Sequence, residues 1–354
     1  MERKKIEYII RRSLENIGQF QTPGGLFKTY RMDYSREACP NDYIDESKAR
    51  FIDTKYDHAF ILDILMDLRN HFPSEDSFRH VMERGIKHIM DEAIVTTQVI
   101  DGKPAKTLQW RHYNVPHNNG RMILPDIDNI ARCLMVMQRA EHQPIEIPGN
   151  WINTQNNYSQ FGNMMKQIQG NGHSGIMTYF GEKPDNDIDI FCNISALLSI
   201  FGFLSNGGKG TKYNFLNDVI SYVNDAVHDG ETEAEYYDPI KVLYNYSKLM
   251  RFYEIPQIVR ERLRKMLLGF KPKNVLESAL SANALMEIGE INGAEALIRD
   301  IIKLHRTGSW DAFAFYHQRH PRRIFGSRGV TTAICLEALN TWSKISGKPK
   351  IACS

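Results

Sequence analysis

A repeat of paired amphipathic helices constrains the fold of this chain more than any other feature of its sequence. Segments whose apolar residues recur at i, i+3, i+4 and i+7 follow one another along nearly the whole chain, and strand-like alternation is scarce. We group these segments into six units, each with an outer helix, a loop and an inner helix. The predicted pairs are 4–17 with 56–68, 78–93 with a helix that begins at 126, 158–168 with 187–201, 213–227 with 237–250, 256–268 with 275–288, and 293–305 with 330–342.

Six such antiparallel pairs can close into a double ring, an (α/α)6 barrel, in which the second helix of each pair lies inside. Inner helices should be more apolar than outer ones, and the segments 194–201 and 330–336, both on predicted inner helices, are strongly apolar. We therefore predict an all-α fold with residues 1–354 in a single domain. All inner helices of such a ring start at the same end, so the outer-to-inner loops gather over one mouth of the barrel. We expect the functional site at that mouth.

The composition fits this architecture and excludes several classes of function. With 354 residues, 42% of them hydrophobic, the chain is long enough for a large core. Its 44 Lys and Arg against 42 Asp and Glu leave a formal charge of +2, which is too balanced for a general nucleic-acid binder. The cysteines form no close CxxC pair and favour a reduced, cytoplasmic protein. No secretory signal is predicted, and the longest apolar stretch, 194–204, is too short to span a bilayer.

Acidic residues stand at the start of the second inner helix. Asp126 and Asp128 lie one residue apart beside Asn129, and Pro125 precedes them. Carboxylates at a helix start satisfy its free N–H groups and its dipole, so an ordinary cap is one interpretation. The other interpretation is that these carboxyl groups act as an acid in a reaction. Apolar burial raises the pKa of Asp128, and a like-charged Asp126 nearby raises it further, which keeps the acid protonated until it acts. The adjacent amide then orients that acid.

The next inner helix repeats the acidic start. Asp187 and Asp189 open it with the same spacing, and Asn193 lies one turn deeper than Asp189 on the same helix face. Adjacent inner helices aim these groups at one point, so Asn193 is placed to donate a hydrogen bond to Asp128. An asparagine that only bonds across two inner helices is the alternative, and the sequence leaves both open.

The mouth loops and inner helices are rich in aromatic residues. An aromatic-lined cavity beside one buried carboxylic acid suits carbocation chemistry, because π faces stabilise a developing cation without acting as nucleophiles. Aromatic residues at helical spacing also form ordinary core, and for Phe191 both interpretations stay open. The candidate cavity residues are Trp110, Tyr113, Tyr179, Phe180, Phe191, Trp310, Phe315 and Tyr316.

Three segments resemble a known family. Residues 125–131, Pro-Asp-Ile-Asp-Asn-Ile-Ala, are similar to the DxDD motif, commonly written PDxDDTA, of the class II terpene cyclases of the squalene–hopene cyclase superfamily. Residues 187–193 resemble the next inner helix of that family, where a histidine or an asparagine contacts the acid. Loop 24–27, Gly-Gly-Leu-Phe, resembles a degenerate version of its QW repeats.

The resemblance implies roles for individual residues. Asp128 is then the proton donor, Asp126 assists it and Asn193 orients it, with Asn129 and Asp189 in support. The final aspartate of the motif is Asn129 in this chain, so a role that rests on a third carboxylate does not carry over.

The implied reaction is the cyclisation of a linear isoprenoid. The acid protonates a terminal alkene or epoxide, and internal alkenes close successive rings through carbocations, with no redox cofactor and no metal. Larger members of the family carry a second α-barrel domain, for which 354 residues leave no room. The chain therefore resembles the small single-domain cyclases that fold polyprenylated aromatic acids into meroterpenoids.

A local basic cluster is the candidate head-group site. Arginine pairs well with carboxylate and diphosphate groups, so Arg111 on one mouth loop and Arg319, Arg322 and Arg323 on the last are placed to hold an anionic head group. A solvated basic loop is the alternative. A long apolar substrate comes from a membrane, which is compatible with shallow peripheral contact. The sequence leaves the oligomeric state open.

Other functions on helical rings are the rival interpretations. Residues 217–225 resemble the magnesium-binding NDxxSxxxE motif of class I terpene synthases, but the chain has no Asp-Asp pair for a second motif. A zinc site needs clustered ligands, and the only close HxxH pair, His317 with His320, has no cysteine beside it. A glycoside hydrolase with Asp128 as acid and Asp189 as base stays open. So does a non-catalytic helical-repeat scaffold, which predicts a polar or filled centre.

Overall fold

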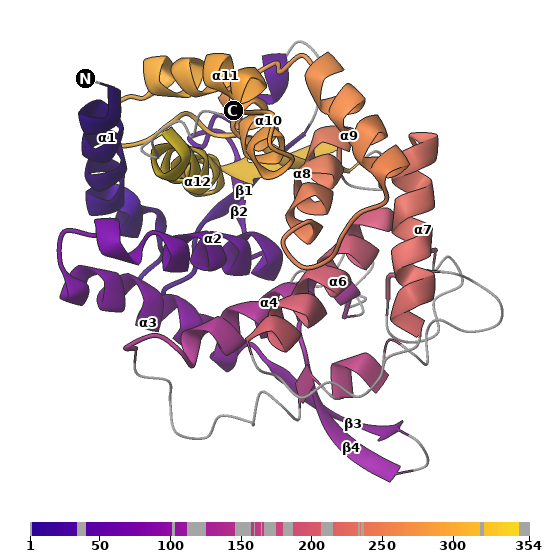
Figure 1. Cartoon of the computed structure of the whole chain (residues 1–354). Coiled ribbons are helices and arrows are strands. Elements are labelled where there is room, and N and C mark those ends of the chain that lie inside the picture. The colour runs from indigo at the N-terminus through magenta and orange to yellow at the C-terminus, as the bar shows by residue number, and fades with distance from the viewer. Residues whose placement is uncertain are drawn as a thin grey trace.

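The helices of the molecule form two concentric rings (Figure 1). A computed structural model describes residues 2–33, 40–100, 103–111, 125–145, 157–158, 160–163, 165, 175–179, 187–206, 215–232, 234, 237–318 and 322–346. The inner helices are α2 (Lys55–Asp67), α4 (Ile127–Ala140), α6 (Ile190–Ser205), α8 (Pro239–Leu249), α10 (Val275–Glu287) and α12 (Arg328–Ser346). The outer helices are α1 (Glu2–Ile17), α3 (Glu75–Asp91), α7 (Phe215–Asp229), α9 (Gln257–Gly269) and α11 (Ile291–Leu304), and the described residues between 157 and 165 are helical as well.

The inner helices close into a ring. Going round, α2 packs against α4, α4 against α6, α6 against α8, α8 against α10, α10 against α12, and α12 against α2 again. Outer helices cover the junctions, since α3 contacts α2 and α4, α9 contacts α8 and α10, and α11 contacts α10 and α12. The predicted (α/α)6 barrel is confirmed, with the second helix of each unit inside.

Burial explains which helix of a unit lies inside. In the outer helix α1 one apolar face is buried, with Ile6, Ile10 and Leu14 among its residues, and the other faces are charged. In the inner helix α6 every residue from Ile190 to Ile200 is buried. A fully buried aliphatic side chain contributes roughly 1.5–3 kcal/mol, so a helix that is apolar all round is stable only between other helices.

Side-chain caps define where several helices begin. Asp126, Asp189 and Asn274 each accept a backbone N–H at the start of α4, α6 and α10, which stabilises a helix start by about 1 kcal/mol. Because Asp189 is the cap and has an extended backbone, α6 begins at Ile190, three residues later than the predicted 187.

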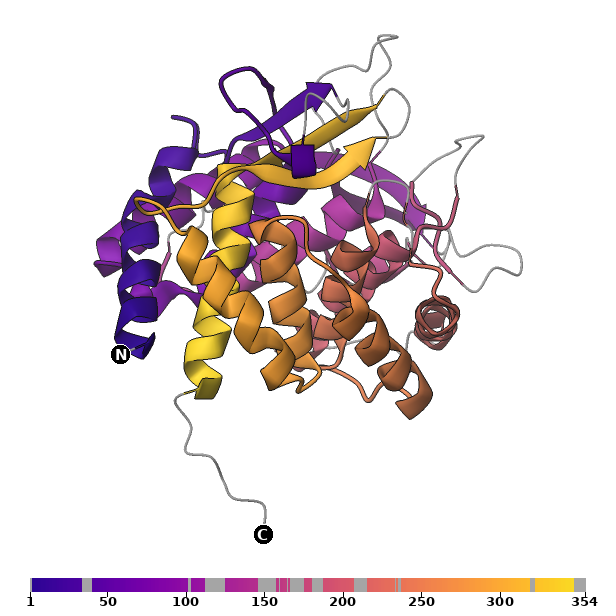
Figure 2. The ribbon, with the colours of Figure 1, turned by 90° about the horizontal axis from the view of Figure 1, so that it is seen from above.

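Two small antiparallel sheets lie on the outer-to-inner loops, where the sequence predicted no strands. In the larger sheet, β1 (Thr29–Asp33) and β2 (Arg50–Ile52) of the first loop join β5 (Phe313–Gln318) and β6 (Arg323–Ser327) of the last, in the order β2-β1-β6-β5. Its strands lie together at one end of the helices (Figure 2). A hairpin of β3 (Ile94–Ile100) and β4 (Lys103–Gln109) stands on the second loop. The larger sheet ties the first unit to the last across the mouth.

One glycine permits that sheet. A Cβ added at Gly326 would lie 2.1 Å from the carbonyl oxygen of Phe313, so a larger residue does not fit between β5 and β6. Short 3-10 turns, η1 (Gly18–Phe20), η2 (Pro40–Asp42) and η3 (Arg69–His71), complete the connections.

The thiols and the helix lengths bear on the compositional predictions. Cys133, Cys192 and Cys335 are buried and free, as predicted, whereas Cys39 and Cys353 lie outside the described residues. Within the described ranges, no helix combines the length and the apolar character needed to cross a membrane.

Candidate active site

Asp126, Asp128 and Asn129 form a compact buried group at the start of α4. The Oδ1 atom of Asp126 accepts the backbone N–H of Asn129 at 3.0 Å, and Oδ1 of Asp128 accepts the same N–H at 2.8 Å. The side-chain amide of Asn129 donates to both carboxyl groups. Asp126 and Asp128 are each 5% exposed, and Asn129 is fully buried. One residue therefore holds the two predicted carboxyls within a few ångströms of each other.

Two opposing effects act on the pKa of Asp126, and the loss of hydration on burial is larger than the effect of the helix dipole. Burial raises the pKa of Asp126 above its ordinary value, and hydrogen bonds with the side chains of Asp128 and Asn129 offset only part of that rise. The dipole of a helix start favours an exposed carboxylate by about 0.3–1 kcal/mol, less than the cost of burying the charge. A hydrogen bond between two carboxyl groups also requires that one of them is protonated. The pair is suited to hold a proton in a buried place.

A short extended segment around Thr178 joins the starts of α4 and α6. The carbonyl oxygen of Thr178 accepts the N–H of Ile127 at 3.0 Å, and the N–H of Thr178 donates to the carbonyl oxygen of Asp187 at 3.0 Å. Tyr179 forms a backbone bridge with Asp126. The two acidic helix starts therefore lie side by side, as the repeat predicted, and Tyr179 lies next to the acid pair.

Asn193 holds this segment in place instead of the acid. Its amide oxygen accepts the N–H of Ile176 at 2.8 Å, and its Nδ2 donates to the carbonyl oxygens of Ile176 at 3.0 Å and Asp189 at 2.8 Å. An amide group has two N–H donors, and both are used here. The expected hydrogen bond from Asn193 to Asp128 is therefore corrected. Asn129 occupies the position that Asn193 was predicted to fill.

Replacement of Asn193 by alanine is expected to lower the free energy of unfolding by about 1–3 kcal/mol, because it leaves the N–H and carbonyl groups of the buried Ile176 without partners. Urea denaturation measures this loss. Asn283→Ala is the matched control, since Asn283 is also a buried asparagine of an inner helix but reaches only the carbonyl oxygen of Ile334, at 3.4 Å. An equal loss in both variants would contradict the role given to Asn193.

The second acidic start differs from the first in its chemistry. Asp189 caps α6, and its Oδ1 accepts the N–H groups of Phe191 at 2.7 Å and Cys192 at 3.1 Å. Asp187 is exposed and joins the segment through its backbone. Support of Asp128 by Asp189 stays a prediction.

Six aromatic side chains form a layer beside Asp128. The ring of Phe191 stacks on that of Tyr237 with 3.6 Å between ring centres, and the Tyr237 hydroxyl donates to Oδ2 of Asp128 at 3.4 Å. The Tyr56 ring centre lies 5.7 Å from that of Phe191 and 6.1 Å from that of Tyr237. We call Tyr56, Phe60, Phe191, Tyr237, Phe315 and Tyr316 the aromatic layer.

The aromatic layer combines predicted and unpredicted residues. It brings together Phe191, Phe315 and Tyr316 from the candidate set, and it adds Phe60, Tyr56 and Tyr237. The two tyrosines precede aspartates at the starts of two other inner helices. That Tyr-Asp pattern is the signal that identifies them. Burial raises the pKa of Tyr56 to about 12 and that of Tyr237 well above its ordinary value, so both hydroxyls stay protonated near neutral pH.

The two predicted cavity tryptophans have another role. The indole Nε1 of Trp110 donates to the carbonyl oxygen of Ile89, in the last turn of α3, at 2.8 Å, and that of Trp310 donates to Ile301, in the last turn of α11, at 2.8 Å. Both side chains therefore anchor mouth loops to outer helices, which corrects their assignment to the cavity. Tyr113 and Phe180 lie outside the described residues.

The predicted head-group arginines come from two loops, Arg111 from the second and the other three from the last. Arg323 on β6 lies 3.6 Å from the Asp33 carboxylate of β1, Arg322 is exposed just before it, and Arg111 follows β4. Arg319 lies outside the described residues. Their binding of an anionic group stays a prediction.

Asp57, in the first turn of α2, is a buried carboxyl that the sequence interpretation missed. Its Oδ2 accepts the hydroxyl of Thr29 at 2.8 Å, whereas Oδ1 has no hydrogen-bond partner among the residues that the structure describes. Burial raises the pKa of Asp57 to about 7, and the nearby charge of Asp128 adds to this rise. The side chain has no exposed surface, so the group is disfavoured as a carboxylate.

This carboxyl gives stability a pH dependence of known sign. Because the pKa of Asp57 is higher in the folded chain, the folded state binds the proton more tightly, and the free energy of unfolding falls as pH rises from about 4 to about 7. The full loss is at most about 4 kcal/mol. Asp57→Asn keeps an acceptor for Thr29 but cannot ionise. The free energy of unfolding of the variant, minus that of the unaltered protein, should therefore rise by roughly 2–4 kcal/mol between pH 5 and pH 8.

Urea denaturation at both pH values measures the gain. Asp53→Asn is the matched control, because Lys55 and His88 outweigh burial and hold the pKa of Asp53 at about 2. Asp53 is then ionised in the folded and the unfolded chain at both pH values, so this variant should keep the pH dependence of the unaltered protein. Equal pH dependence in the unaltered protein and Asp57→Asn would contradict this account.

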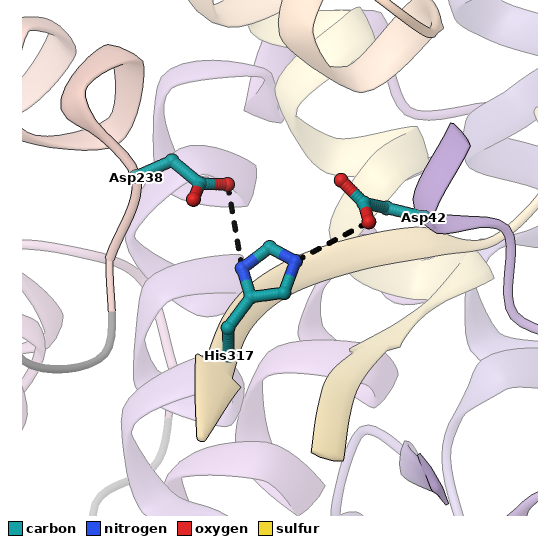
Figure 3. A group of neighbouring side chains, drawn as sticks. All are labelled: Asp42, Asp238 and His317. Carbon is teal, nitrogen blue, oxygen red and sulfur yellow. Dashed lines mark ion pairs between the residues drawn. The ribbon is translucent and has the colours of Figure 1, made fainter. Parts of the chain in front are cut away.

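A third polar group lies at the mouth, around His317 (Figure 3). Its Nε2 is 3.4 Å from Oδ1 of Asp42 in η2, and its Nδ1 is 3.3 Å from Oδ2 of Asp238 before α8. These three residues are close enough to hold a metal ion. The Lys241 ammonium already lies 2.7 Å from Oδ2 of Asp238, so ion pairs account for the arrangement. It fastens β5 to the start of α8, next to Tyr237.

Comparisons place this fold among known enzymes. No protein-family model and no curated protein matches the sequence. Among solved structures, the type II terpene cyclase MstE from Scytonema, in complex with geranylgeranyl dihydroxybenzoate, is similar over 97% of this chain and 99% of its own, with 12% identity and a TM-score of 0.61. Unsaturated glucuronyl hydrolase from Bacillus sp. GL1 is similar over 96% of each chain, with 14% identity and a TM-score of 0.58.

The similarity extends to part of a larger cyclase. The ent-copalyl diphosphate synthase from Streptomyces platensis matches over 81% of this chain and 50% of its own, with 12% identity and a TM-score of 0.53. The chain therefore has the single-domain (α/α)6 barrel fold of the class II terpene cyclases, a fold that unsaturated glucuronyl hydrolase shares.

Proposed function

We propose that this protein is a class II terpene cyclase, a single domain that protonates a terminal alkene or epoxide of a linear polyprenyl substrate. The observation that carries the proposal is the buried pair Asp126 and Asp128, bridged by Asn129 beside the aromatic layer. A carboxylic acid that starts a carbocation reaction must be protonated before it acts and must face side chains that do not trap the cation.

The proposed reaction conserves atoms and charge. Asp128 transfers its carboxyl proton to the terminal alkene carbon, and the alkene electron pair forms the new C–H bond, leaving a carbocation and a carboxylate. Each internal alkene then forms a C–C bond to the cation, and loss of a proton from carbon, or capture by a nucleophile, ends the sequence. The N–H groups of Asn129 stabilise the carboxylate, and Asp126 assists the return of the proton.

The aromatic layer has to open for this reaction. The rings of Tyr56, Phe191 and Phe315 have no exposed surface, so within the described part of the chain a substrate tail has to separate them to lie between these rings and Asp128. An isoprenoid tail offers the rings the apolar contact that they give one another, and the π faces then stabilise the cation.

A prenylated aromatic acid is the substrate class that we propose. MstE, which has this fold at 12% identity, is described in complex with geranylgeranyl dihydroxybenzoate. Arg322 and Arg323 lie on the last mouth loop, where a carboxylate or diphosphate head remains when the tail enters the barrel. Shallow contact with a membrane would deliver such a substrate.

A glycoside hydrolase is the second candidate, favoured by the similarity to unsaturated glucuronyl hydrolase. It needs two carboxyls, for which Asp128 and Asp189 are available. The two backbone N–H groups that Oδ1 of Asp189 accepts describe a helix cap, which favours the cyclase.

Incubation with a panel of prenylated benzoates, polyprenyl diphosphates and squalene tests the proposal. Mass spectrometry and NMR spectroscopy of the extracts should find a product with the mass of its substrate and fewer alkenes. Hydrolysis of unsaturated oligosaccharides without any cyclised product would replace the cyclase by the hydrolase.

A further inference from the structure

A second layer of side chains crosses the barrel below the aromatic layer. Arg132 follows Asp128 by four residues, so it lies on the same face of α4, about 6 Å deeper along the helix. Its guanidinium donates to Oδ2 of Asp63 at 3.2 Å, to the Tyr56 hydroxyl at 3.2 Å and to Oδ1 of Asn245 at 3.4 Å. We call Asp63, Arg132, Tyr244, Asn245, Lys248 and Glu337 the charged layer.

The contacts that α8 makes in the charged layer pass through the barrel axis, whereas the pair of Asp63 and Arg132 joins the neighbours α2 and α4. Lys248 and Tyr244, both on α8, bind Glu337 on α12, with 2.8 Å between Nζ of Lys248 and Oε1 of Glu337. Arg132 on α4 reaches Asn245, also on α8. The ring neighbours of α8 are α6 and α10, so its side chains meet those of α4 and α12 only across the axis. The barrel is closed at this depth.

The charges in this layer are matched and buried. Arg132 is 2% exposed, and Arg139, one layer deeper, also binds Asp63. Burial alone raises the pKa of Asp63, but Arg139 and Arg132 outweigh it and hold that pKa below its ordinary value. The guanidinium carbon of Arg132 also lies 5.0 Å from the ring centre of Phe60, on the underside of the aromatic layer.

The two layers resist an apolar chain to different degrees. A pair of aromatic rings gains about 0.5–1.5 kcal/mol beyond its burial, and a tail that replaces one ring restores the buried apolar contact. Separation of a buried ion pair leaves charges without partners and costs about 3–5 kcal/mol. A tail that enters from the mouth therefore displaces rings and stops at Arg132.

We propose that the charged layer is the floor of the reaction chamber and that Arg132 and Asp63 set the tail length that this enzyme accepts. The inference deepens the proposed function and rests on it. Only a few carbon atoms fit between Asp128 and the floor, so the terminal alkene lies at the acid and the head group stays at the mouth. The positive charge of Arg132 also disfavours a carbocation below the aromatic layer.

The variant that tests the floor is the double substitution Asp63→Leu with Arg132→Met, which keeps the volume and removes the ion pair. Prenylated benzoates with tails of increasing length are the substrates. We expect kcat/KM for the longest tail, relative to the shortest, to rise about tenfold or more, the scale on which pockets separate chains that differ by a methylene. Arg264→Met with Glu290→Leu removes an exposed pair outside the layer and should leave this ratio unchanged. A folded, active Asp63→Leu/Arg132→Met variant with an unchanged ratio would overturn the proposal.

A measurement on the unaltered protein does not depend on a variant that folds. A saturated prenyl benzoate with a diazirine at the tail end should label residues of the aromatic layer on irradiation. Labelling of Arg139 or Asn340, which follow Arg132 and Glu337 by seven and three residues on the same helices and lie deeper than the charged layer, would overturn the floor, as would no labelling inside the barrel. Labelling reports binding and not turnover. Correct labelling without any cyclised product would overturn the proposed function and leave the floor standing.

Discussion

Replacement of Asp128 by asparagine is expected to abolish turnover, with kcat at least about 10³-fold lower and the fold intact. Asparagine has the shape of aspartate but no proton strong enough to add to an alkene. Its Oδ1 still accepts the N–H of Asn129, so we expect the free energy of unfolding to change by no more than about 1 kcal/mol. Product formation by mass spectrometry, together with urea denaturation, measures both quantities.

Two matched variants sharpen this result. Asp126→Asn retains a helix cap and removes only the assisting carboxyl, so a fall of about 10–100-fold is expected. Asp189→Asn retains the cap of α6 and removes only a supporting carboxyl, so it should lower the rate of cyclisation far less than Asp128→Asn, whereas a two-carboxyl hydrolase would lose activity. Near-normal cyclisation by Asp128→Asn would remove Asp128 as the proton donor.

Replacement of Asp63 by leucine is expected to cost about 3–5 kcal/mol of stability, the largest effect on folding among the variants considered. Asp63 binds Arg132 and Arg139 together, so its loss leaves the guanidinium of Arg132 buried without an anion. Arg139 keeps Asp67 as a partner, and the penalty therefore falls mainly on Arg132. Urea denaturation at pH 7 gives the free energy of unfolding.

The reverse substitution provides the control. In Arg132→Met, Asp63 still binds Arg139, so this variant should lose clearly less stability than Asp63→Leu. The combined variant should recover most of the loss, because two apolar residues replace the ion pair. High salt should change these differences little, since the pair is buried. A loss below about 1 kcal/mol in Asp63→Leu would contradict the structural account of the charged layer.

The helices were predictable because their information is local. An inner helix predicted at 275–288 is Val275–Glu287, and an outer one predicted at 256–268 is Gln257–Gly269. Each buries a face that recurs every three to four residues, and this period is visible in any window of the sequence. The pairing of β1 with β6 was missed because each strand has five residues and the two come from opposite ends of the chain. Such pairing leaves no local pattern.

The residues of the candidate site also fall into those that the local sequence predicts and those whose position depends on distant contacts. Asp126, Asp128 and Asn129 are neighbours in the sequence, so their grouping follows from a cap geometry that any such helix start adopts. Trp110 and Trp310 were assigned to the cavity on their aromatic character alone. Which face they take was decided by their indole N–H groups, which bond carbonyl oxygens of outer helices.

The sequence by itself determined the six helix pairs, the end of the barrel at which the candidate site lies, and the acid pair at the start of α4. Periodicity and capping act over a few residues, and a chain carries them wherever it folds. Only the tertiary structure decided that Tyr237 bonds Asp128, that Asn193 holds a backbone segment, and that Arg132 reaches Asn245 across the axis. Tyr237 and Asn245 lie more than 100 residues from their partners on α4, so only ring closure brings these side chains within hydrogen-bond distance. The contacts of Asn193 depend on how the segment around Ile176 folds back onto α6.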